Sequence, residues 1–203
     1  RRLEELCYGI GNRLSGSESL DRAIAWAVEC LKRDGHENVR TEKVMVPRWV
    51  RGRESLTMIR PKTEPMAMLG LGGSVGGVVE AEVVVVRDEK ELGDATGKIV
   101  LFNNPYVSYG ESVKYRVHGA RLAAEKGAVA CLVRSVASRS LRSAHTGGMR
   151  YGDAKRRIPA AAISIEDAET LAHHPGAVVR LEMEARDEGE VESANVIAEL
   201  RGR

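Results

Sequence analysis

The feature that most constrains the fold is a strand, a helix and a second apolar strand, in that order, in the middle of the chain. The run KIVLF at Lys98–Phe102 is followed by an expected helix over Glu111–Lys126, closed by Gly127, and then by the apolar run AVACLVR at Ala128–Arg134. A helix between two strands is the usual crossover that joins parallel neighbours in a sheet. We therefore predict an α/β (α+β) fold with some parallel strand pairing.

Further strands and one more helix surround this central unit. The run EVVVV at Glu82–Val86 and the run IPAAAISI at Ile158–Ile165 each predict a strand, and EDAETLAHH at Glu166–His174 predicts a short helix. The segment AVVRLEMEA alternates so that one face of a strand carries Val179, Leu181, Met183 and Ala185. The middle of the chain is expected to be a β-rich domain with flanking helices.

The two ends of the chain carry elements of their own. Ser17–Asp34 has an apolar stripe at helical spacing, a serine that can cap its start, and Gly35 as a stop. Asn38–Pro47 is predicted to be a strand stopped by its proline. The last strand is expected at Ala194–Leu200, behind a charged, glycine-containing hinge at Arg186–Ser193.

The order of these elements indicates an inserted domain. A self-contained stretch of ordinary domain length separates the first strand from the last one. We expect residues 1–50 to supply the first helix and strand of one domain, residues 51–187 to form the insertion, and residues 188–203 to return as a further strand of the first domain.

Composition argues against several classes of function. The 31 Lys and Arg residues nearly balance the 29 Asp and Glu residues, for a formal charge of +2, so the chain as a whole has no electrostatic basis for binding nucleic acid. No run is apolar for long enough to span a membrane. Cys30 and Cys131 sit in apolar runs and are expected to be small core residues.

Several stretches together resemble one family of enzymes. They are GNRLSGSESLDRAIAW, DGHENVRTEKVMVPRWVRG, GKIVLFNNPYVSYGESVKYRVHGA, RSVASRSLRSAHTG and SANVIAEL. In order along nearly the whole chain, they are similar to the N-terminal half of zinc-dependent exopeptidases of the plasma glutamate carboxypeptidase type. The part from GKIVLF to RIPAAAIS is similar to a protease-associated domain, which that family inserts into its peptidase domain. Tyr8 departs from the family pattern.

The resemblance implies that the chemistry lies outside this sequence. Family members place their zinc ligands after the strand that SANVIAEL resembles, so zinc is expected in the missing peptidase domain. The histidines here form no HExxH motif and no cluster with ligand spacing, and we assign no catalytic residue and no metal ligand. The expected partners are the chain's own peptidase domain, short peptides and a second copy of the chain as a homodimer. Export from the cell is also implied by resemblance.

Two other stretches resemble motifs for phosphate binding and for serine hydrolysis, but each lacks residues that the motif requires. The glycine-rich run GLGGSVGG at Gly70–Gly77 lacks the Lys-Ser/Thr pair of a phosphate-binding loop, and we interpret it as a turn. The serines at 135, 138, 140 and 143 lie close in sequence to His145, but no GxSxG elbow accompanies them, which argues against a serine hydrolase.

The long loop at Ser135–Tyr151 is the first candidate functional surface. Long loops inside compact domains are often lids or binding surfaces. We expect it to narrow access to the zinc site, with Arg142, His145 and Thr146 as polar contacts to peptide termini. The alternative is an exposed loop that only the neighbouring domain orders.

A second candidate surface is NNPYVSYGESVKYR, where Tyr106, Tyr109 and Tyr115 offer the amphipathic contact area that is enriched at interfaces. The alternative is that these rings cover the sheet edge and the start of the helix. The expected function is thus a non-catalytic protease-associated region of a metallo-exopeptidase that shapes substrate access or mediates interactions. The alternative is a free-standing module that binds peptides or a partner protein without peptidase activity.

Overall fold

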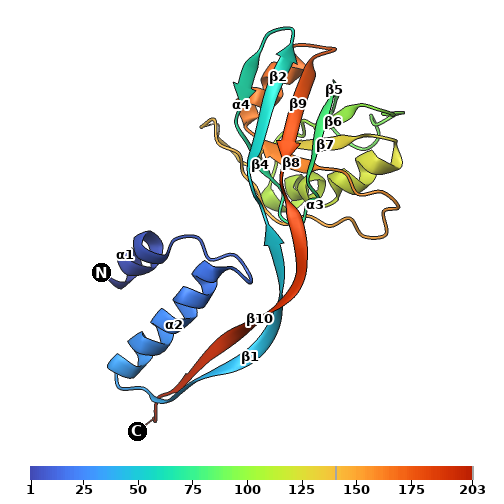
Figure 1. The fold of residues 1–203 in the computed structure, drawn as a ribbon. Coiled ribbons are helices and arrows are strands. Elements are labelled where there is room, and N and C mark those ends of the chain that lie inside the picture. Colours follow the sequence, from blue (N-terminus) through green and yellow to red (C-terminus); the bar gives the residue numbers. More distant parts are fainter. Residues whose placement is uncertain (140, 203) are drawn as a thin grey trace. The chain divides into compact units, whose positions relative to one another are not determined.

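The computed structural model describes residues 1–139 and 141–202 and divides the chain into two compact units. One unit is Arg51–Arg186; the other consists of Arg1–Val50 together with the residues from Asp187 onward (Figure 1). Of the residues discussed above, Ser140 and Arg203 lie outside the described part.

The unit Arg51–Arg186 is built on an eight-stranded sheet in the order β3-β2-β9-β5-β6-β7-β8-β4. β3 and β4 lie at opposite ends of this order, yet only Ala67 separates them in the chain, so the sheet curls until its two edges meet. The strands are β2 (Glu54–Arg60), β3 (Glu64–Met66), β4 (Met68–Gly70), β5 (Gly77–Val86), β6 (Ile99–Phe102), β7 (Ala130–Arg134), β8 (Ala160–Ile163) and β9 (Val178–Met183).

The predicted crossover is confirmed. β5, β6, β7 and β8 pair in parallel, with Leu101 opposite Leu132 across the β6–β7 ladder. Every residue of β6 and β8 is buried, as expected for parallel strands covered on both faces. The outer pairs of the sheet, including β2 with β9 and β4 with β8, are antiparallel.

Two capped helices complete this unit. In α3 (Tyr109–Glu125) the Ser108 hydroxyl accepts a hydrogen bond from the amide of Glu111, and in α4 (Ile165–Ala172) the Ser164 hydroxyl accepts one from the amide of Asp167. α3 lies against β6 and β7. The Tyr115 ring stacks on that of Phe102 at 4.8 Å between centroids. Tyr115 is only 1% exposed, so the prediction that it offers surface contact area was wrong.

The other unit contains α1 (Arg2–Glu4), the π-helix η1 (Glu5–Ile10), α2 (Glu18–Arg33), β1 (Glu37–Val50) and β10 (Arg186–Glu199). The helix expected at Ser17–Asp34 is confirmed: the Ser17 hydroxyl accepts from the amide of Leu20, and Gly35 follows the helix with a φ of +80°. β1 and β10 pair as a two-stranded sheet.

Two boundaries in this unit differ from the predictions. β1 continues past Pro47 to Val50, because proline is tolerated in a two-stranded ribbon where its missing N–H can face outward. The segment Arg186–Ser193, expected as a hinge, belongs to β10. Cross-strand ion pairs, such as Arg48 with Glu188 at 2.8 Å, give its charged residues partners on β1.

Candidate binding surface

The loop Ser135–Tyr151, which follows β7, is fastened to the body of its unit at several points. Ser135 is the first of them, with an exposed fraction of 3%. Its hydroxyl accepts a hydrogen bond from the amide of His145 at 2.8 Å and donates to the carbonyl of Ile163 at 2.7 Å. One buried hydroxyl therefore joins the beginning of the loop, its later part and the end of β8.

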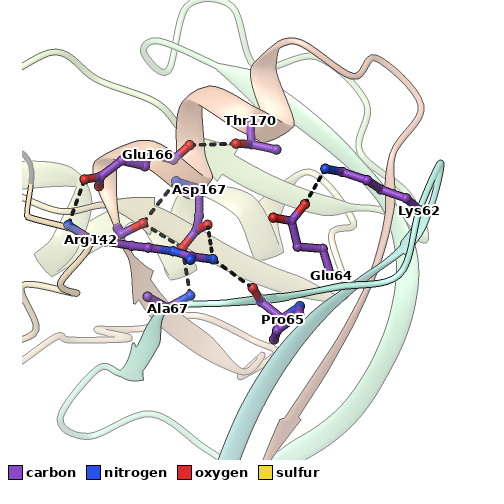
Figure 2. Close-up of polar contacts among 9 residues, drawn as sticks. Lys62, Glu64, Pro65, Ala67, Arg142, Glu166, Asp167 and Thr170 are labelled. Atoms are coloured by element: carbon purple, nitrogen blue, oxygen red, sulfur yellow. Dashed lines mark hydrogen bonds and ion pairs between the residues drawn. The ribbon is translucent and has the colours of Figure 1, made fainter.

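Arg142 makes the second attachment (Figure 2). Its backbone φ is +46°, in the left-handed region, and its amide donates to the Glu166 carboxylate at 2.7 Å. Its guanidinium donates to the carbonyl of Pro65 at 3.2 Å and lies 3.7 Å from the Asp167 carboxylate, which also accepts from the amide of Ala67. The Arg142 side chain thus links the start of α4 to β3.

Lys62 and Glu64 flank this attachment (Figure 2). The Lys62 ammonium lies 2.8 Å from the Glu64 carboxylate. This contact with Lys62 is the main reason that the pKa of Glu64 is lowered from its ordinary value, and the charge of Arg142 adds to the effect.

The third attachment joins the loop to the glycine-rich run after β4. The Thr146 hydroxyl donates to the carbonyl of Gly70 at 2.7 Å, and Gly72 exchanges hydrogen bonds with Gly147 and Met149. The carbonyl of Gly70 also accepts from Arg51 at 2.6 Å. The glycine-rich run is therefore a tightly bonded turn, in agreement with its interpretation from the sequence.

Tyr151 closes the loop inside the unit. Its hydroxyl donates to the carbonyl of Ile158 at 2.6 Å and accepts from the amide of Val75 at 3.0 Å. Burial raises the pKa of the Tyr151 phenol, so the group remains a neutral hydrogen-bond donor at neutral pH. The loop Ser135–Tyr151 is consequently held at both ends and in its middle.

The structure brings the two predicted surfaces together at one place. The rings of Tyr109, the first residue of α3, and His145 in the loop meet edge to face, with centroids 6.2 Å apart. The Tyr109 hydroxyl accepts a hydrogen bond from Arg116 at 2.9 Å. From the sequence, Ser135 was considered only as a serine near His145 and Arg116 only as part of the second surface, because local spacing does not indicate the contacts that either residue makes in the fold.

The exposed side chains of this region differ in how free they are. Tyr106 and Tyr109 are 38% and 51% exposed, and Leu141 is 83% exposed. The polar groups of Arg142 and Thr146 are engaged within their own unit, whereas His145 is held through its backbone amide and its ring lies at the surface. That the predicted residues, Tyr106, Tyr109, Arg142, His145 and Thr146, contact peptide or a neighbouring domain stays a prediction.

Among residues 1–139 and 141–202, no three His, Cys, Asp or Glu side chains gather in a way that fits a metal ion. The adjacent rings of His173 and His174 each bond through Nδ1 to the carbonyl four residues earlier, that of Glu169 at 2.7 Å and that of Thr170 at 2.8 Å. The described residues therefore do not fit a zinc ion. In the same part of the chain, no helix has the length and apolar character to cross a bilayer.

Comparison with known proteins connects this geometry to a family. Residues 75–171 match the PA domain family. Carboxypeptidase Q of Mus musculus is 44% identical over 99% of this chain and 45% of its own length, and that of Homo sapiens is 43% identical over the same shares. The chain thus spans about half the length of the curated relatives it matches.

Solved structures of peptidases are also similar to this chain. A peptidase M28 precursor from Shewanella amazonensis has a TM-score of 0.91 at 35% identity, over 99% of this chain and 50% of that one. BSAP, a zinc aminopeptidase from Bacillus subtilis, has a TM-score of 0.70 at 19% identity, over 97% of this chain and 45% of that one, and so shares the fold. The predicted α/β (α+β) class is confirmed; residues 75–171 match the PA domain, and the chain is similar along nearly its whole length to carboxypeptidase Q and to a peptidase M28 precursor.

Proposed function

We propose that this chain is the non-catalytic, PA-containing region of a zinc exopeptidase that hydrolyses dipeptides or short peptides. Residues 1–50 and 188–203 would belong to the peptidase domain, residues 51–187 would be the inserted domain, and the zinc ligands would lie on further chain like that of the longer relatives. Metal-activated water would then be supplied outside the described residues.

One observation carries this proposal: the unit containing β1 and β10 has almost no core of its own. In its described part only Ala23 and Cys30 are buried apolar residues, while Leu3, Tyr8 and Leu14 are more than half exposed. A helix beside a two-stranded ribbon is marginally stable in water unless further structure covers it. Together with relatives of about twice this length, the exposed apolar surface supports a unit that is completed by a peptidase domain.

The test compares two proteins on the same dipeptide panel. The native protein from its source would be measured for intact mass, zinc content and hydrolysis, beside the 203-residue chain in added zinc. We expect a native mass well above 22.1 kDa, bound zinc, and turnover by the native protein alone. A native chain of this mass without zinc, or equal turnover by the 203-residue chain, would overturn the proposal.

Within that enzyme, the exposed part of the loop would shape access to the substrate. His145 and Tyr109 are the members of the predicted set whose rings meet at the surface. In the native enzyme, His145→Ala should change the preference for peptide length without loss of zinc. Unchanged turnover and unchanged length preference would contradict a role in access.

A free-standing binding module is the second candidate, and one observation favours it. The unit Arg51–Arg186 contains nearly all of the buried apolar residues and holds its own loop in place. If the native protein ends near Arg203 and forms a stable homodimer or binds peptides without metal, this second function replaces the first.

A further inference from the structure

Arg116 on α3 is a half-buried cation without an acidic partner. Among the described residues, no Asp or Glu forms an ion pair with it, and its Nε atom is buried without a hydrogen-bond acceptor. Burying a cation is costly unless a counter-charge and acceptors compensate it. Because the Nε atom is enclosed, an external anion could pair only with the Nη atoms at the end of the guanidinium.

Contacts with Tyr109 and Gly147 hold the Arg116 guanidinium in place. Its Nη2 donates to the Tyr109 hydroxyl at 2.9 Å, and its Cζ lies 5.5 Å from the centroid of the Tyr109 ring. The backbone of Gly147 lies against it so closely that a Cβ there would be 2.7 Å from Cζ and 2.9 Å from Nε. A glycine at 147 thus leaves the space that the guanidinium fills.

The loop that contains Gly147 brings no acidic residue of its own to this place. The sequence from Arg134 to Gly152 contains no Asp or Glu, and the charge of Arg142 is already paired with Asp167. The exposed Tyr109 ring lies beside Arg116, and the exposed His145 ring meets Tyr109 edge to face. An anion carried on a peptide would find both a charged group and ring surface here, whereas inorganic phosphate would use only the charge.

We propose that Arg116, framed by Tyr109, His145 and Gly147, is a binding site for a peptide carboxylate. An arginine fork pairs with the two oxygens of a carboxylate through parallel N–H donors. A free C-terminus and an acidic side chain present the same group, and either would fit. The site lies within Arg51–Arg186 and is independent of the peptidase assignment, since binding is measured without turnover.

The test is a ¹H–¹⁵N NMR titration of the 203-residue chain, with three probes that separate the sources of the carboxylate. The probes are Gly-Ala with a free C-terminus, its C-terminal amide, and N-acetyl-glutamate amide, which carries only the side-chain carboxylate. We expect the Arg116 Nε–H and Gly147 amide signals to shift with one or both acids and not with the Gly-Ala amide. Equal shifts with that amide, no shift with either acid, or tighter binding of inorganic phosphate would overturn the proposal.

Two glycine variants provide a matched pair. Neither Gly147 nor Gly148 has a positive φ, but a Cβ at 148 meets nothing within 4 Å. Gly147→Ala should displace the guanidinium and weaken binding about tenfold or more, as loss of a charge-assisted hydrogen bond does, while Gly148→Ala should not. Equal affinities for the two variants, with unchanged circular dichroism spectra, would refute the site.

Arg116→Gln removes the charge and tests the same site without relying on the glycine. It should abolish the carboxylate-dependent shifts while the amide spectrum of β6 and β7 stays as in the parent chain. Retained binding by a folded Arg116→Gln protein would also refute the proposal.

Discussion

Ser135→Ala should loosen the loop Ser135–Tyr151 and lower the free energy of unfolding. The change removes the bond accepted from the amide of His145 and the bond donated to the carbonyl of Ile163. The Ile163 carbonyl keeps the amide of residue 135 as a donor at 2.9 Å, but the His145 amide is left without its acceptor. At about 0.5–1.5 kcal/mol for each hydrogen bond, the expected loss is about 1–3 kcal/mol.

Urea unfolding followed by far-UV circular dichroism measures this loss, because both tryptophans, Trp26 and Trp49, lie outside Arg51–Arg186 and do not report directly on it. Hydrogen exchange measures the local effect, and the amide of His145 should exchange roughly tenfold faster or more. Ser138→Ala is the control, since Ser138 is exposed and the change should stay within about 0.5 kcal/mol. Equal effects of the two variants, or an unchanged rate at His145, would refute the role of the Ser135 hydroxyl.

Three further outcomes follow from packing and charge. Gly119→Ala should destabilise the protein by about 1–3 kcal/mol, because the added Cβ would lie 3.0 Å from the buried Phe102 ring. Gly110→Ala, on the same helix, meets no atom within 4 Å and should stabilise the protein slightly, and the urea midpoints of the two variants test this difference. Burial raises the pKa of the Cys131 thiol, so in the native protein a thiol reagent should label exposed Cys7 first, and equal rates would contradict this order. A hydrogen bond from Arg53 lowers the pKa of Glu184, so the stability that this pair contributes is present above the unfolded-state pKa and is lost as the pH falls through the folded-state pKa. The urea midpoints of the parent protein and of Glu184→Gln should therefore differ at neutral pH and converge in acid. A difference that does not depend on pH would argue against this role of Glu184.

The elements with strong periodicity could be predicted from the sequence. The crossover from β6 through α3 to β7 and the alternation of β9 follow from apolar spacing that burial requires. Cys30 and Cys131 are buried, as their apolar neighbours indicated. Such patterns are readable because each face of the element meets a different environment.

Other elements depend on pairing that local sequence does not record. β2 alternates, with Leu56 and Met58 buried, but polar neighbours interrupt the pattern, and β3 and β4 are too short to show a period. The sequence predicts a strand from Glu82, whereas β5 begins at Gly77 because its first residues pair with β9.

The candidate surface could be predicted only in part. The loop length and the tyrosines indicated two regions, and the contact of Tyr109 with His145 unites them. The loop and the start of α3 are distant in sequence, so only the folded chain places Arg116 against Gly147.

The way in which Arg51–Arg186 begins and ends has a consequence for the order of folding. The amide of Glu184 donates to the carbonyl of Arg53 at 2.9 Å, so the first and last segments of this unit lie side by side. Once the unit has folded, the connection between β1 and β10 is as short as a tight turn. In the unfolded chain, the loop that must close between the two strands is longer by roughly five doublings of its length. At about 0.6 kcal/mol for each doubling, prior folding lowers the entropic cost of closing the β1–β10 ribbon by about 3 kcal/mol. We therefore expect the unit Arg51–Arg186 to fold before the β1–β10 ribbon whose strands it connects.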